Sequence, residues 1–262
     1  MNNINMIPFL TLFRREVSRF LKVMVQTILT PFISSFLYLL VFGVTLGQHV
    51  QFKENISYLS YLIPGLMMMG LINNSYQNSS SSIVTMKFTG DLEDLRIVPL
   101  SNQTIVWAMA LASWVRGMIV ALVTWVVGNI FMYWQQDQWL NISHPWAFIF
   151  FSLMAGLSFG HIGIAMAFWA KTMDQLSAFS SFILLPLIYL GGVFISLDRL
   201  SPFWRSIAQW NPLLYFIEGF RYSFFGTSEI SMERAIAVSM MSLFIFYWRA
   251  LKSLKPGCFS RW

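Results

Sequence analysis

Charged residues are scarce in this chain: Asp, Glu, Lys and Arg together make up 11% of its 262 residues. A soluble domain of ordinary composition is about 25% charged, so these charges are too few to cover a water-facing surface. This excludes a soluble enzyme and a nucleic-acid-binding domain. The 56% of apolar residues excludes an intrinsically disordered chain. The class that remains is an integral membrane protein.

Cysteine and histidine are also too few to build a reactive site. The one cysteine, Cys258, allows neither an internal disulfide nor a cysteine metal cluster, and His49, His144 and His161 are scattered. The sequence has no G-x-S-x-G motif and no phosphate loop ending in Gly-Lys-Ser/Thr. We therefore expect no enzyme activity, no catalytic residue, no metal site and no cofactor on this chain. If the protein uses ATP, another chain must bind it.

The chain does have long stretches without Asp, Glu, Lys or Arg. A bilayer core of about 30 Å needs about 20 apolar helical residues, and all but the last of these stretches are long enough. The last lies between Arg234 and Arg249, has only 14 residues, and needs its neighbours to span the membrane. We expect one all-α domain over residues 1–262 with six transmembrane helices, at about residues 24–46, 57–80, 106–134, 146–170, 176–197 and 230–251.

Lys and Arg are distributed unequally between the two sides that these six spans create. Eleven lie near the two ends of the chain and in the loops after spans 2 and 4, against five on the other side, with Arg116 set aside. Positive charge gathers on the cytoplasmic side of membrane proteins. Both termini are therefore expected in the cytoplasm.

Residues 6–22 form an amphipathic pattern before the first span. Apolar and basic side chains fall on different faces of a helix, which indicates an interface helix lying in the cytoplasmic headgroup layer. It could be a passive anchor for the first span or a moving part, and the sequence leaves both open. The residues of this helix are Phe13, Val17 and Phe20 on the apolar face and Arg15, Arg19 and Lys22 on the basic face.

The loop between spans 2 and 3 predicts a short helix over residues 91–98. Asp91 can cap its start, acids fill its first turn, and Pro99 ends it. A helix of about two turns is marginal alone, so it must dock on something. Its acids favour a protein partner over an anionic lipid surface. The residues offered to that partner are Asp91, Leu92, Glu93, Asp94, Leu95 and Arg96.

Two polar features lie inside the predicted spans. Arg116 would be costly at the centre of a helix in lipid, so we expect it to reach the cytoplasmic surface, with a buried functional charge as the alternative. The polar run over residues 73–82 cannot all face lipid. We expect it to hold helices together, and the alternative is a hydrated pathway or a subunit interface.

Residues 198–224 alternate aromatic with charged residues after the fifth span. Two prolines divide this segment into two short helical pieces, and neither is long enough or apolar enough to cross. We expect both at the outer interface or dipping into it, with Glu218 and Arg221 three residues apart on one helix face, where they can pair. The outer-segment residues are Asp198, Pro202, Trp204, Asn211, Pro212, Glu218 and Arg221.

Several motifs together resemble the type-2 ABC transporter permeases. They are IPGLM at 63–67, GDLEDLRIVPLS at 90–101, AKTMDQLS at 170–177, GGVF at 191–194, Ser-Pro-Phe-Trp at 201–204, Asn211-Pro212 and the Glu218/Arg221 spacing. The resemblance is closest to the multidrug-like branch, related to polysaccharide exporters. The last residues, after Trp248, look atypical for the family.

This resemblance implies a membrane subunit of an ATP-driven exporter in the bacterial inner membrane. It implies six spans with both termini inside, a second permease copy, and two separate ATP-binding subunits that hold ATP and Mg²⁺. Residues 6–22 would be the interface helix, residues 91–98 the coupling helix that docks on the ATPase, and residues 198–224 the outer helices that close the exit. Lipid is a further partner, and nucleic acid is not.

Two other functions remain to be weighed against the exporter. A self-contained channel or secondary carrier predicts charges within the membrane or inverted repeats, and the sequence shows neither. A polytopic membrane enzyme predicts a cluster of catalytic residues, which the scattered histidines do not provide. The substrate stays open among lipid, drug and glycan, because aromatic residues serve pathways and lipid contacts alike.

Overall fold

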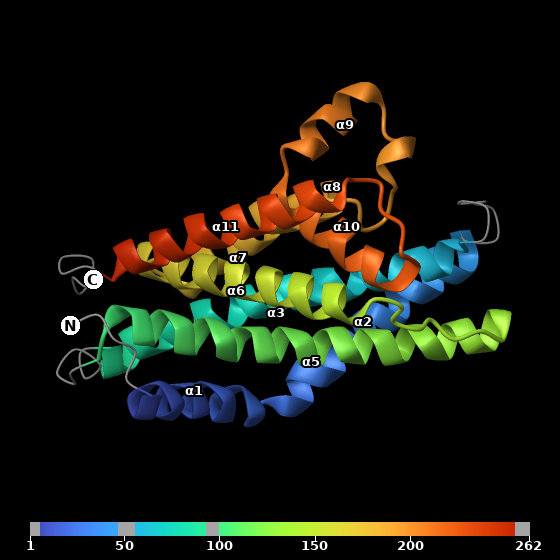
Figure 1. The fold of residues 1–262 in the computed structure, drawn as a ribbon. Helices are drawn as coiled ribbons and strands as arrows, with labels where there is room; N and C mark the ends of the chain where they lie inside the picture. The colour runs from blue at the N-terminus through green and yellow to red at the C-terminus, as the bar shows by residue number, and fades with distance from the viewer. Residues whose placement is uncertain (1–5, 47–55, 93–99, 255–262) are drawn as a thin grey trace.

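The computed structural model describes residues 6–46, 56–92 and 100–254, and every regular element among them is a helix. Figure 1 shows the long helices side by side in one elongated bundle, with α1 beginning and α11 ending at the same end. We call that the terminal end. In chain order the elements are α1 (Met6–Leu21), α2 (Met24–Tyr38), η1 (Leu39–Leu46), α3 (Tyr58–Thr89), α5 (Asn102–Gln136), α6 (Pro145–Trp169), α7 (Met173–Phe179), η2 (Ser180–Leu184), α8 (Leu185–Leu190), η3 (Leu197–Arg199), α9 (Pro202–Gln209), α10 (Pro212–Phe225) and α11 (Met232–Ser253).

Four helices in the described part are long and apolar enough to cross a membrane, by length and composition: α5, α6, the continuous α7–η2–α8 helix and α11. The polar run of residues 73–82 lowers the hydropathy of α3, and α2 with η1 offers a shorter apolar stretch, Thr27–Gly43.

The predicted fifth span, 176–197, extends too far. The helix ends at Leu190, because the chain turns through the glycine pair that follows, with a φ of 90° at Gly192. The last helix has 22 residues and is not shortened by the atypical tail.

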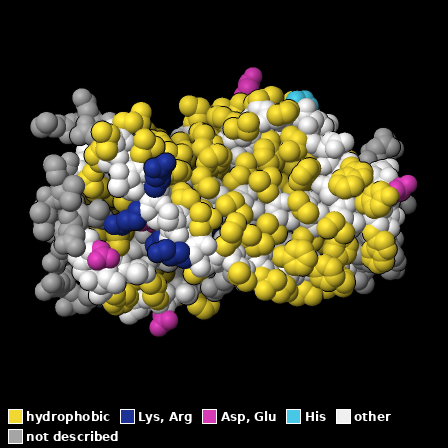
Figure 2. All heavy atoms as spheres, turned by 90° about the horizontal axis from the view of Figure 1, so that it is seen from below, with side chains coloured by type: hydrophobic (Ala, Val, Ile, Leu, Met, Phe, Trp, Pro, Cys, Tyr) yellow, Lys and Arg dark blue, Asp and Glu magenta, His cyan; other side chains and the backbone are white. Residues whose placement is uncertain are grey.

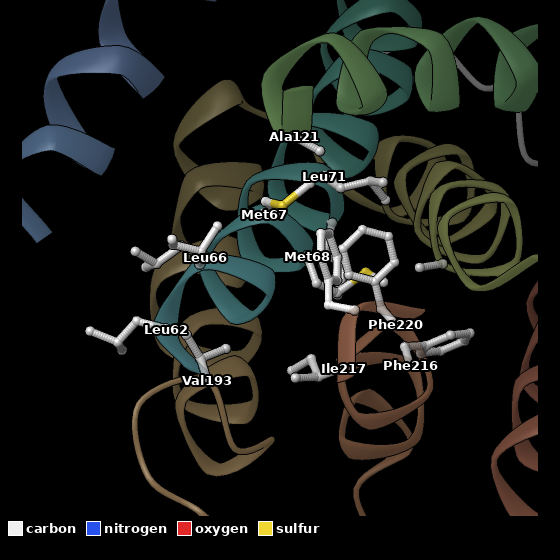
Figure 3. Packing of buried hydrophobic residues seen from close by; sticks show 14 of the residues in the cluster. Leu62, Leu66, Met67, Met68, Leu71, Ala121, Val193, Phe216, Ile217 and Phe220 are labelled. Atoms are coloured by element: carbon white, nitrogen blue, oxygen red, sulfur yellow. The ribbon is translucent and has the colours of Figure 1, made fainter. Parts of the chain in front are cut away.

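The core lies around α3, which packs on α5, α6 and α10. In Figure 3, Met68 of α3 and Phe220 of α10 meet inside this core, and both are fully buried. Glycines let the helices approach closely. A Cβ on Gly163 of α6 would lie 2.5 Å from the Tyr76 carbonyl oxygen of α3, and one on Gly117 of α5 would lie 2.7 Å from the Leu71 carbonyl oxygen. Small residues allow such close backbone contact between membrane helices.

A second apolar cluster lies at the terminal end and includes residues of α1, α3, α5, α6 and α11. Figure 1 shows α1 running alongside α5 rather than projecting away from the bundle, and the two helices are in contact. Leu12 and Phe20 of α1 are therefore buried against protein. Leu10, on another face, stays 48% exposed.

Candidate functional site

A polar groove opens between α2, α3 and α5 and extends to α7 and η2. It encloses about 670 Å³. The groove forms because α2 packs mainly on α5, where Ser35 Oγ and Thr124 Oγ1 lie 2.9 Å apart, and leaves one face of α3 uncovered. Its polar lining consists of Thr27, Thr30, Ser34 and Ser35 of α2, Asn73, Asn74, Gln77, Ser80 and Ser81 of α3, Thr124 of α5, Ser177 and Ser180, together with the guanidinium groups of Arg19 and Arg116.

The polar run of α3 divides between two faces of the helix. On one face, Ser79 Oγ lies 2.5 Å from Ser113 Oγ of α5, and Asn78 donates to the same hydroxyl at 3.1 Å. On the other face, Asn73 and Gln77 line the groove. The first face therefore holds α3 and α5 together, as expected of the polar run. The second face offers hydrogen-bonding groups to the groove.

Arg116 does not extend away from the bundle but lies in the groove lining. Its Nη1 donates to Asn78 Oδ1 at 3.4 Å, and its buried Nε has no hydrogen-bond partner. Arg19 of α1 reaches the same oxygen, with its Nη2 donating at 3.1 Å. Two guanidinium groups thus converge on one amide at the edge of the groove.

Glu16 is a site residue that sequence reasoning missed. Its carboxylate is 1% exposed, accepts a hydrogen bond of 2.6 Å from Ser82 of α3, and pairs with Arg19 at 3.2 Å and Arg15 at 3.3 Å. This fastens α1 to α3. The signal is present in the sequence, because Leu12, Glu16 and Phe20 recur at a spacing of four and share one helix face.

The predicted interface helix is therefore turned relative to the expectation. Its most buried stripe is the one that holds Glu16, whereas Phe13 and Val17 are only half-buried. The Glu16 carboxylate needs polar partners and finds them in Ser82 of α3 and Arg19, which turns this stripe toward the bundle. Of the basic residues, Arg15 and Lys22 are exposed and Arg19 points into the groove lining. Figure 2 shows the molecule from below relative to Figure 1. On that face Lys and Arg gather toward the terminal end, and apolar side chains cover most of the rest.

Only the start of the predicted coupling helix falls within the described residues. Gly90 ends α3 with a φ of 88°, Asp91 and Leu92 are helical, and Leu92 packs partly on the apolar cluster at the terminal end. Glu93, Asp94, Leu95 and Arg96 lie outside the described residues, as does His49.

Lys87 holds the last turn of α3 against the end of α6. Its Nζ donates to the Ala167 carbonyl at 2.6 Å and the Phe168 carbonyl at 3.2 Å, at the C-terminus of α6, where a cation also complements the helix dipole. Burial lowers the pKa of Lys87 from its ordinary value. The loop that follows α3 therefore starts from a fixed point.

Glu218 and Arg221 form a buried ion pair on α10, as their spacing predicts. Arg221 also donates to the Gly192 carbonyl at 2.9 Å and lies 3.6 Å from the ring centroid of Tyr61 of α3. Glu218 accepts from the Glu229 backbone N–H at 3.1 Å. This network joins α3, α10 and the loops on either side of the outer segment.

The remaining outer-segment residues begin helices or lie on the surface. Asn211 caps α10 through its Oδ1, which accepts from the Leu213 N–H at 3.1 Å, and Pro212 occupies the first helical position. Pro202 begins α9 in the same way, and Trp204 is 51% exposed. Asp198 pairs with Arg205 at the surface. The segment therefore combines an exposed α9 with an α10 that is inserted into the core.

The described histidines do not form a metal site, and no group of three metal-ligating side chains occurs in the part of the chain that the structure covers. His161 is fully buried between the rings of Trp107 and Tyr247, with centroid distances of 5.3 and 5.4 Å. His144 packs on Tyr222 at 4.8 Å. Both pack as aromatic rings.

Known proteins match this chain over most of its length. The family model described as ABC-2 type transporter matches residues 8–225. The inner membrane transport permease YadH of Escherichia coli strain K12 is 32% identical over 238 residues, which is 90% of each chain. The Shigella flexneri permease of the same name matches to the same extent. Nodulation protein J of Rhizobium leguminosarum bv. viciae is 22% identical over 224 residues, 83% of this chain and 82% of that protein.

Proposed function

This chain belongs to the ABC-2 type transporter family, and from that premise we propose that it is the permease subunit of an ATP-driven exporter. It is a multi-pass protein of the bacterial inner membrane, the location that the name of its relative YadH carries. It supplies the substrate pathway and a coupling surface. ATP and Mg²⁺ bind to a separate subunit.

The observation that carries this proposal is the polar groove. Alongside apolar side chains such as Leu66 and Met69, it is lined by amides, hydroxyls and two arginines. Such groups cannot face hydrocarbon without large cost, so the groove must be filled by water or substrate, or covered by protein. A transport pathway meets this requirement.

The helices beside the groove support a second permease copy as its cover. Leu29 and Phe32 of α2 are 51% and 41% exposed, and Phe182 of η2 is 80% exposed. The α7–η2–α8 helix buries little of its apolar surface in its own bundle. Two copies placed groove to groove would bury these helices and enclose one central pathway.

The remaining parts of the proposal follow the sequence. Six spans, including α2 with η1 and α3, place both termini in the cytoplasm, where eleven of the Lys and Arg residues then lie. Residues 91–98 form the coupling helix. The outer segment closes the far end of the pathway, braced by the Glu218–Arg221 pair.

The test is co-purification of the tagged permease from native membranes after cross-linking. We expect an ATP-hydrolysing protein with a phosphate loop, in equal copy number. Leu92→Ser with Leu95→Ser should reduce its recovery, because apolar contact with the partner is weakened. Thermal unfolding separates this effect from the loss of the Leu92 contact with the permease's own apolar cluster. Leu92→Met with Leu95→Met keeps the apolar contact and should retain the partner. Recovery of the permease without any ATP-binding protein would contradict the proposal.

A further inference from the structure

The terminal end of the groove concentrates positive charge that the described part of the chain balances only in part. Arg19 and Arg116 both donate to Asn78 Oδ1, at 3.1 and 3.4 Å, so their charged groups lie within a few ångströms of a common atom. Glu16 pairs with Arg19 and Arg15. Arg15 and Arg19 therefore share the single carboxylate of Glu16.

Of the two groove arginines, Arg116 is the one without a carboxylate partner among the described residues. Among the described residues its only hydrogen bond is to Asn78, and its buried Nε has no partner. No carboxylate belongs to the described lining of the groove. Asp174 is exposed in the first turn of α7, and in the described part of the chain no ion pair joins it to either arginine. An anion placed beside the partly buried guanidinium of Arg116 would stabilise its charge. The like charge of Arg19 close by makes an anion between the two arginines still more favourable.

The rest of the groove indicates what accompanies the anion. Asn73, Asn74 and Gln77 offer amide groups to it, and its lining also includes the apolar side chains of Leu66 and Met69. A ligand with a charged head, a polar middle and an apolar chain finds a matching group for each part in this lining. Guanidinium groups bind phosphate through paired, charge-assisted hydrogen bonds.

We propose that Arg19 and Arg116 form a binding site for the phosphate group of an amphiphilic substrate at the terminal end of the groove. This rests on the proposed function and narrows its substrate to phosphate-bearing amphiphiles. Asn78 holds the two guanidinium groups apart and in register. Glu16 fixes Arg19 from behind, on the α1 side, and leaves the groove free of negative charge.

The test measures binding of dodecyl phosphate to the purified permease in a phosphate-free, non-ionic detergent, by native mass spectrometry. Arg116→Gln keeps a hydrogen-bonding side chain and removes the charge, so binding should weaken at least tenfold, as for the loss of a charge-assisted hydrogen bond. Arg249→Gln is the matched control, because Arg249 is exposed on α11 at the same end of the bundle and outside the groove. Arg116→Lys keeps the charge without the planar fork and should lose less. Thermal unfolding of each variant checks that it is folded.

Equal affinity of the wild type and Arg116→Gln would overturn the site, as would an equal loss in Arg249→Gln. Competition by inorganic phosphate at the same concentration as dodecyl phosphate would overturn the amphiphile and leave a site for free phosphate. Since binding needs no ATPase, its failure would leave the permease function standing, and co-purification tests that function separately.

Discussion

At the scale of single residues, the Glu218–Arg221 pair makes a direct prediction about stability. Both side chains are almost fully buried. Reversing one charge, as Glu218→Arg or Arg221→Glu, places two like charges together and should cost about 3–5 kcal/mol. The double reversal should recover part of this loss, because attraction returns while the Gly192 carbonyl and the Tyr61 ring then face the wrong charge. Thermal unfolding of the purified variants measures the difference.

The exposed Asp198–Arg205 pair is the matched control for this experiment. Its side chains are 61% and 41% exposed, so the same reversals should change stability by less than about 1 kcal/mol. If the double reversal at positions 218 and 221 costs as much as the two single reversals added together, the buried pair is not energetically coupled.

Residues differ in how far the sequence reveals their roles. The Glu218–Arg221 pair follows from a spacing of three on one short helix, which is a local relation. Glu16 pairs partly with Arg19 on its own helix but also with Ser82, far along the chain. Asn78 and Arg116 likewise meet only when α3 and α5 pack. The spacing on α1 shows which helix face holds Glu16, but contacts between helices decide what Glu16, Asn78 and Arg116 bind.

At the scale of elements, the close approach of α3 and α5 can be tested with two glycines. A Cβ on Gly117 would lie 2.4 Å from Ser75 Oγ and 2.7 Å from the Leu71 carbonyl oxygen, so Gly117→Ala should destabilise the protein by about 1–3 kcal/mol. Gly70→Ala at the same helix pair meets a Val120 methyl group at 3.0 Å. That side chain can move, and alanine favours the helix by about 1 kcal/mol, so this variant should be close to neutral. Equal unfolding temperatures for the two variants would refute the backbone contact.

The sequence predicts the positions of the long helices better than it predicts where they end or which neighbours they pack against. The long apolar stretches that contain α5 and α6 predict both helices, because length and apolarity select a membrane helix, although Arg116 lies within α5. The charge-free stretch within α11 has only 14 residues, and flanking residues complete that helix. The fifth helix stops at Leu190 because the glycine pair overrides an apolar sequence that continues to Leu197. The rotation of α1 and the insertion of α10 into the core depend on which neighbouring surface is uncovered, and the bundle decides that.

At the scale of the whole molecule, the all-helical membrane class follows from composition, because 11% charged residues cannot cover a soluble protein. The groove does not follow from composition. The run of residues 73–82 shows that polar groups need partners, but the packing of α2 on α5 determines which of them remain uncovered. The account therefore centres on one claim, that the uncovered face of α3 lines a hydrated transport pathway.

Labelling of single cysteines tests that claim most directly. In a Cys258→Ser background, Gln77→Cys places a thiol in the groove, and Phe244→Cys places one on α11, on a 70% exposed apolar surface outside the groove. The thiol reagent is charged and membrane-impermeant, and it is added to permeabilised membrane vesicles so that it reaches both sides of the membrane. It should modify Gln77→Cys and leave Phe244→Cys unreacted, because only the first thiol meets water. An unreactive Gln77→Cys, together with full reaction of the same protein after denaturation, would contradict a hydrated pathway in this groove.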